Sequence, residues 1–196
     1  MVHYVLEGDR PVETSHSRKL TYGDYARLPD DNLRHEIIGG EHYVTPSPAT
    51  RHQRISSRLL RLLGGFAEEH GLGEVFDAPF DVVLSPHDIV VPDLLYLSHE
   101  RAQFLTQNNL QGPPDLVIEI LSPTTRRRDE RLKRDLYARA GVREYWLVDP
   151  DRKEVTIYRR GTDAFDPPDR RSAAAGNRLT SLLLPGFEAS LEKLFA

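Results

Sequence analysis

Hydrophobic residues recur with helical spacing in two stretches of the chain. In the first, predicted as a helix over residues 50–70, they follow steps of three and four residues: Ile55, Leu59, Leu62, Leu63 and Phe66. This spacing places them on one face of a helix, and Gly71 is suited to end it. The second helix is predicted over residues 126–140, with an apolar stripe and a closing glycine: Leu132, Leu136, Ala140 and Gly141.

Runs of β-type residues fill much of the remaining chain. Residues 115–121 are apolar on both faces except for their acids, which predicts a central strand. Arg34–Ile38 and residues 41–44 flank Gly39-Gly40, a pattern typical of a tight hairpin. Further strands are predicted at 74–77, 80–84, 89–97, 144–148, 154–158 and 179–184, with short helices near Thr21 and Ser190 and a loop over 163–176. This order predicts an α/β fold, with helices packed on a mixed β-sheet.

Length and composition fit one globular domain. The 196 residues are 39% hydrophobic and 29% charged. Residues 1–19 show no sustained period and are predicted to be an N-terminal arm, followed by a domain over 20–196. No run of 18 apolar residues and no secretory signal are visible, so we expect a cytoplasmic protein without a membrane span. The chain has no cysteine, which excludes thiol chemistry and thiolate metal sites.

Charge is unevenly distributed along the chain. The net charge is −4, but residues 126–139 contain seven basic and three acidic residues. Arg126, Arg127 and Arg128 stand near the start of a predicted helix, where the helix dipole favours acids. Phosphate contact is one explanation for this arrangement, and a merely solvated helix face is the other.

Three acids interrupt apolar β-type runs. Glu119 lies within the central strand, Asp93 lies between Val-Val-Pro and Leu-Leu, and Glu36 lies in the hairpin. A buried carboxylate needs a cation, a basic side chain or a raised pKa. Divalent cations such as Mg²⁺ take oxygen ligands, so two such acids and a lysine fit a hydrolytic metal site. Ordinary salt bridges or a water-facing edge strand would account for the same pattern.

The predicted second helix supplies a lysine. Lys133 is one residue from the apolar stripe and so flanks the buried face, from which it could reach the end of the strand. Asp129 and Lys133 have the spacing of an i, i+4 ion pair, which is commonly a solvated surface pair.

Several spaced motifs together resemble one family. They are Pro92-Asp93, the strand Asp-Leu-Val-Ile-Glu-Ile-Leu-Ser-Pro at 115–123, Asp129, Lys133 and Tyr137, and Gly-Val-Arg-Glu-Tyr-Trp-Leu-Val-Asp-Pro at 141–150. The hairpin His-Glu-Ile-Ile-Gly-Gly-Glu at 35–41 and Pro46-Ser47-Pro48 with His52 add to the likeness. This order resembles the Uma2 family, which is classed as restriction-endonuclease-like within the PD-(D/E)xK nuclease superfamily.

The resemblance implies roles for individual residues. Asp93 and Glu119 would match the two motif acids and bind Mg²⁺ or Mn²⁺ with the backbone carbonyl of Ile120. The superfamily's lysine normally follows two residues after the second acid, where this chain has Leu121; Lys133 would be its migrated equivalent. Remaining candidates are Glu36 as an extra acid, Arg126, Arg127 and Arg128 as nucleic-acid contacts, and His52 and Asp129 as weaker members of the site.

The resemblance therefore implies a metal-dependent endonuclease acting on DNA, with a homodimer expected by analogy with nucleases that cut both strands. A catalytically silent nucleic-acid-binding or accessory protein of the same fold is the alternative. A structural domain whose acids are simply salt-bridged is a third reading. No glycine-rich phosphate loop is present, so we expect no nucleotide cofactor.

Overall fold

The computed structural model describes residues 18–196. The arm predicted over residues 1–19 lies outside these residues, apart from Arg18 and Lys19. The helical elements are α1 (Tyr22–Tyr25), α2 (Thr50–Glu69), η1 (His99–Phe104), η2 (Arg128–Lys133), α3 (Arg134–Ala140) and α4 (Leu191–Phe195). The strands are β1 (Arg34–Ile38), β2 (Glu41–Thr45), β3 (Gly73–Asp77), β4 (Val82–Ser85), β5 (Asp88–Val90), β6 (Leu94–Ser98), β7 (Leu116–Ile120), β8 (Glu144–Asp149), β9 (Glu154–Arg159), β10 (Asp169–Ser172), β11 (Arg178–Thr180) and β12 (Glu188–Ser190).

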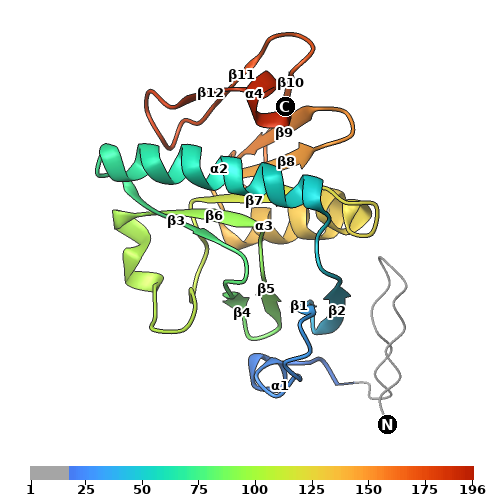
Figure 1. The fold of residues 1–196 in the computed structure, drawn as a ribbon. Coiled ribbons are helices and arrows are strands. Elements are labelled where there is room, and N and C mark those ends of the chain that lie inside the picture. The colour runs from blue at the N-terminus through green and yellow to red at the C-terminus, as the bar shows by residue number, and fades with distance from the viewer. Residues whose placement is uncertain (1–17) are drawn as a thin grey trace.

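A mixed six-stranded sheet, in the order β10-β9-β8-β7-β6-β3, forms the centre of the fold (Figure 1). β7 and β8 run parallel, whereas the other neighbouring pairs are antiparallel. All five residues of β7 are buried, as their apolar pattern predicts. The predicted fold class, a mixed sheet with helices packed on it, is confirmed.

Alternate residues of β7 belong to two separate hydrophobic cores. Leu116, Ile118 and Ile120 pack in the core that contains the apolar stripe of α2. Val117 and Leu121 pack in the second core with Leu136 and Tyr137 of α3. Since side chains alternate along a strand, Glu119 lies on the α3 side of the sheet. In Figure 1 the strands β6 and β7 pass between α2 and α3.

A smaller sheet, in the order β2-β1-β5-β4, stands beside the first. It corrects one prediction, because residues 89–97 form two strands in different sheets rather than one strand. β5 pairs with β1 through Ile89 and Ile37, and β6 pairs with β7. The chain changes sheet at Val91 to Asp93, where Pro92 has no N–H for a sheet ladder. Asp93 is therefore held where the two sheets meet.

Two other predictions differ from the structure near the C-terminus. β10 lies within the stretch predicted as a loop, and the strand predicted over 179–184 is limited to β11. β10 is an edge strand of polar residues held to β9 by backbone pairing, which requires no apolar pattern. Among residues 18–196, no helix has both the length and the apolar character needed to cross a membrane.

The predicted helix over 126–140 is continuous, but it contains a π-helical segment, η2, between Arg126-Arg127 and α3. It ends at Gly141, whose φ of 94° lies in the left-handed region. π-helical segments are rare in proteins, and many of those that occur lie at functional sites. η2 buries Arg128, Asp129 and Lys133, three charged residues directed into the protein.

Gly73→Ala tests the junction between α2 and the sheet. Gly73 has a φ of 143°, and an added Cβ would lie 2.2 Å from the carbonyl oxygen of Leu97. We expect the free energy of unfolding to fall by more than about 1 kcal/mol. The control, Gly65→Ala on α2, meets no atom within 4 Å and should gain up to about 1 kcal/mol. Urea denaturation measures the free energy of unfolding of both variants. Equal effects would contradict the close contact described at Gly73.

Candidate functional site

Strand register brings the two central acids together. Leu94 pairs with Ile118 in the antiparallel β6–β7 ladder, so the next position places Asp93 opposite Glu119. Asp93 Oδ2 accepts a hydrogen bond from the backbone N–H of Ile120 at 2.8 Å, and this fixes its carboxylate against β7. Asp93 and Glu119 are only 3% and 2% exposed, and both line one small cavity.

Asp93 is compensated by two basic side chains. Arg34 Nη1 lies 2.7 Å from its Oδ1, and His52 Nε2 lies 3.1 Å from its Oδ2. Burial alone would raise the pKa of Asp93. The His52 hydrogen bond and the Arg34 charge outweigh burial, so the pKa of Asp93 lies below its ordinary value.

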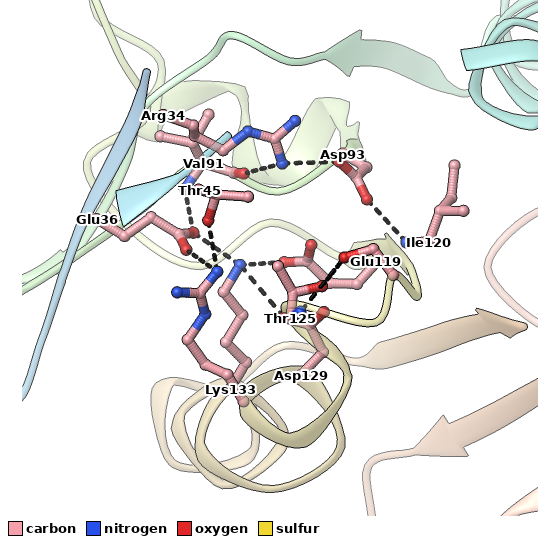
Figure 2. Close-up of polar contacts among 12 residues, drawn as sticks. Arg34, Glu36, Thr45, Val91, Asp93, Glu119, Ile120, Thr125, Asp129 and Lys133 are labelled. Atoms are coloured by element: carbon pink, nitrogen blue, oxygen red, sulfur yellow. Dashed lines mark hydrogen bonds and ion pairs between the residues drawn. The ribbon is translucent and has the colours of Figure 1, made fainter. Parts of the chain in front are cut away.

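The ammonium group of Lys133 occupies the centre of the site (Figure 2). Its Nζ lies 2.7 Å from Glu36 Oε1 and 2.9 Å from Glu119 Oε1. Burial opposes the charged lysine, but Glu119 and Glu36 more than offset this and raise the pKa of Lys133. Glu119 Oε1 also accepts a hydrogen bond from the Tyr137 hydroxyl at 2.8 Å. One ammonium thus joins β1, β7 and η2.

Burial and mutual repulsion oppose the charged forms of Glu119 and Asp129. Burial, followed by the neighbouring acids, raises the pKa of Glu119 despite the opposing effect of Lys133. Burial and the charge of Glu119 likewise raise the pKa of Asp129 well above its ordinary value. Asp129 Oδ1 is buried and receives no hydrogen bond from any residue that the structure describes, although Lys133 Nζ lies 3.8 Å away. A cation placed here would stabilise both carboxylates.

Two adjoining cavities are available at the site. The one lined by Asp93, Glu119 and Lys133 has a volume of about 60 Å³. It can accommodate a few water molecules or a hydrated ion. A larger cavity of about 690 Å³ lies beside it and shares Arg34 and the segment 45–48 of its lining.

Comparisons with known proteins agree with this architecture. A family model described as "Uma2: Putative restriction endonuclease" matches residues 22–192. The chain belongs to the Uma2 family. The uncharacterized protein slr1290 of Synechocystis is 26% identical over 152 residues, which cover 74% of this chain and 76% of that protein.

A solved structure shows the same fold. It is described as a putative nuclease belonging to DUF820 from Anabaena variabilis, with a TM-score of 0.77 and 20% sequence identity. The alignment covers 90% of this chain and 97% of that chain. The resemblance to Uma2 proteins and the mixed-sheet fold are thus confirmed.

The carboxylate and carbonyl oxygens of this site are of the kind that a hard divalent cation prefers. Within residues 18–196, no three histidine, aspartate or glutamate side chains are grouped so that they could hold a metal ion. Mg²⁺, however, commonly uses one or two carboxylates and completes its shell with water and carbonyl oxygens. Glu119 Oε2 receives no hydrogen bond from the described residues, and burial, followed by the charges of Asp93 and Glu36, raises the pKa of Glu119.

The structure separates the three arginines predicted to contact nucleic acid. Arg126 Nη1 pairs with Asp149 at 2.7 Å. Arg128 is buried in the site, where its Nη2 donates to Thr45 Oγ1 at 2.6 Å and lies 3.5 Å from Glu36 Oε2. Arg127 is exposed. Arg126 is therefore directed away from Arg127 and Arg128, which line one cavity.

Sequence reasoning gave no role in the site to Arg34 or to Tyr137, although Tyr137 is one of the motif residues. Arg34 shares a strand face with Glu36, because alternate residues of β1 point the same way. Tyr137 follows Lys133 by four residues along the helix, which places both side chains on one helical face. Both residues could have been predicted from these spacings once Glu36 and Lys133 were chosen as candidates.

Lys133→Met tests the central ion pairs. Without the ammonium group, burial should raise the pKa values of Glu36 and Glu119 above those of the unfolded chain. A raised pKa in the folded state favours folding below the unfolded pKa, and this contribution is lost as pH rises through the folded pKa. We expect a loss of about 3–5 kcal/mol at about pH 8 and a smaller loss at about pH 5.

Urea denaturation at both pH values measures this loss. The control is Lys193→Met, which changes an exposed lysine of α4 and should have little effect at either pH. An equal loss at both pH values would contradict the electrostatic explanation.

Proposed function

We propose that this Uma2 protein is a cytoplasmic endonuclease that hydrolyses phosphodiester bonds in DNA with the help of Mg²⁺ or Mn²⁺. The observation that supports this most directly is the meeting of Asp93 and Glu119 beside a buried ammonium group in one cavity. Family membership and the nuclease-type fold agree with it. By analogy with nucleases that cut both strands, we propose that two copies act together.

Asp93, Glu119 and the carbonyl of Ile120 would hold the cation. When bound, such an ion polarises a phosphate oxygen and lowers the pKa of a coordinated water. Lys133 then has two tasks in this proposal: it orients the attacking water and offsets negative charge developing on the phosphoryl oxygens. Its ammonium is preorganised for both tasks, because Glu36 and Glu119 hold it from two sides.

The remaining candidates act through these groups. Glu36 contacts Lys133 and accepts a hydrogen bond from the Val91 N–H at 3.0 Å, so in this proposal it is a positioning residue. Arg34 and His52 hold the carboxylate of Asp93 in place. Asp129 lies within 3.8 Å of the lysine and adds negative charge next to the proposed cation.

A catalytically silent, nucleic-acid-binding protein is the second candidate function. It is favoured by the fact that both oxygens of Asp93 already have protein donors, namely Arg34, His52 and the Ile120 N–H. Cation binding would require Asp93 to share or exchange these partners. Leu121 also favours this candidate, because it occupies the position where the PD-(D/E)xK superfamily usually has its lysine.

Cleavage of supercoiled plasmid DNA with Mg²⁺ or Mn²⁺ tests the first proposal. We expect Asp93→Asn, Glu119→Gln and Lys133→Met each to lower the cleavage rate by about 10²–10³-fold, since each removes a preorganised charge. Lys193→Met serves as the control on an exposed residue and should cleave like the wild type. Equal nicking by every variant would reveal a contaminating nuclease. Binding without any cleavage would support the silent alternative.

Metal binding can be tested separately from turnover. Adding Mn²⁺ at about 100 times its Kd should stabilise the wild type by about 2.7 kcal/mol. We expect the shift in Tm and the heat in calorimetry to vanish in Glu119→Gln. If the wild type shows neither response, the acids are purely structural ion-pair partners and the proposed cation site is wrong.

A further inference from the structure

A further cavity, of about 260 Å³, lies between β2 and the outer side of η2. Its lining consists of Tyr43, Arg127, Arg128, Arg131 and Leu132. Three of these five residues are arginines and none is an acid. Such a lining suits an anion, because the planar guanidinium group recognises phosphate with two parallel hydrogen bonds.

Arg127 and Arg131 differ from the arginines around them. Both are exposed, and neither forms an ion pair with any acid in residues 18–196. Their neighbours are paired: Arg126 lies 2.7 Å from Asp149, and Arg134 lies 2.7 Å from Asp135. Two neighbouring guanidinium groups without a carboxylate repel each other, and an anion between them would relieve this repulsion.

This basic cavity borders the cavity lined by Asp93, Glu119 and Lys133, which is called the catalytic cavity under the proposed function. Arg128 lines both of them, and its guanidinium lies 5.4 Å from the centroid of the Tyr43 ring. Arg128 is therefore part of the wall of both cavities. Successive phosphates of one DNA strand are spaced by about 3.4 Å along the duplex axis, so phosphates a few nucleotides away lie within reach of this cavity.

We infer that Arg127 and Arg131, beside Tyr43, form a subsite for a backbone phosphodiester of the nucleic-acid strand that enters the catalytic cavity. This inference rests on the proposed function and adds the element that holds the strand in register. Because phosphate contacts carry no sequence information, the subsite positions the strand without selecting bases. It differs from the predicted set of contacts in that Arg131 takes the place of Arg126, while Arg128 lines the cavity beside them.

The test measures the binding of a short labelled duplex by fluorescence anisotropy in EDTA over a range of salt concentrations, so that cleavage cannot interfere. Arg127→Gln/Arg131→Gln should weaken binding at least about tenfold at low salt and reduce the slope of log Kobs against log salt by about 1. Arg127→Lys/Arg131→Lys keeps both charges and should restore the slope.

The matched control is Arg61→Gln/Arg139→Gln, which removes two exposed charges elsewhere, one on α2 and one near the end of α3. It should bind like the wild type. If Arg127→Gln/Arg131→Gln binds like this control, or binds weakly with an unchanged salt slope, the proposed subsite is wrong although the proposed function stands. If the wild type binds no nucleic acid at low salt, the proposed function fails with it. Equal effects on duplexes of unrelated sequence support a phosphodiester contact, whereas a loss confined to one sequence overturns it.

Discussion

The buried ion pairs of Lys133 with Glu36 and Glu119 connect every part of the site. They join the hairpin, the central strand of the large sheet and the π-helical segment through one ammonium group. Removing charges from water costs several kcal/mol per ion, and a well-packed apolar cluster would stabilise the fold as well or better. A network of this kind is therefore poorly explained by stability alone, which agrees with the proposal that it serves a functional site.

The position of the site follows from a break in one strand. Had residues 89–97 continued as a single strand, Asp93 would have sat within a ladder on a sheet face. Pro92 interrupts the ladder, and β5 and β6 enter different sheets. The carboxylate of Asp93 thereby faces the backbone of β7 beside Glu119, while Arg34 of the smaller sheet approaches it from the other side. The junction of the two sheets creates the cavity that neither sheet has alone.

Much of this arrangement could be predicted because polar residues in apolar runs are conspicuous. Glu119, Asp93 and Glu36 stood out in this way, and the helical stripe placed Lys133 at the edge of a buried face. The strand break was missed although Pro92 marks it, because the apolar residues on both sides of Pro92-Asp93 resemble one continuous strand. β10 was missed because backbone pairing alone defines a polar edge strand.

The arginine run shows a different limit. Consecutive helical residues point about 100° apart, so Arg126, Arg127 and Arg128 had to diverge, and only their neighbours in space decide what each one does. Arg126 forms an ion pair with Asp149, and Arg128 forms one with Glu36. The protein carries a net charge of −4, and charges more than about 10 Å away are largely screened at moderate salt. Under the proposed function, a nucleic-acid strand would therefore have to be held by local unpaired cations, and Arg127 and Arg131 are two such cations beside the cavity lined by Asp93 and Glu119.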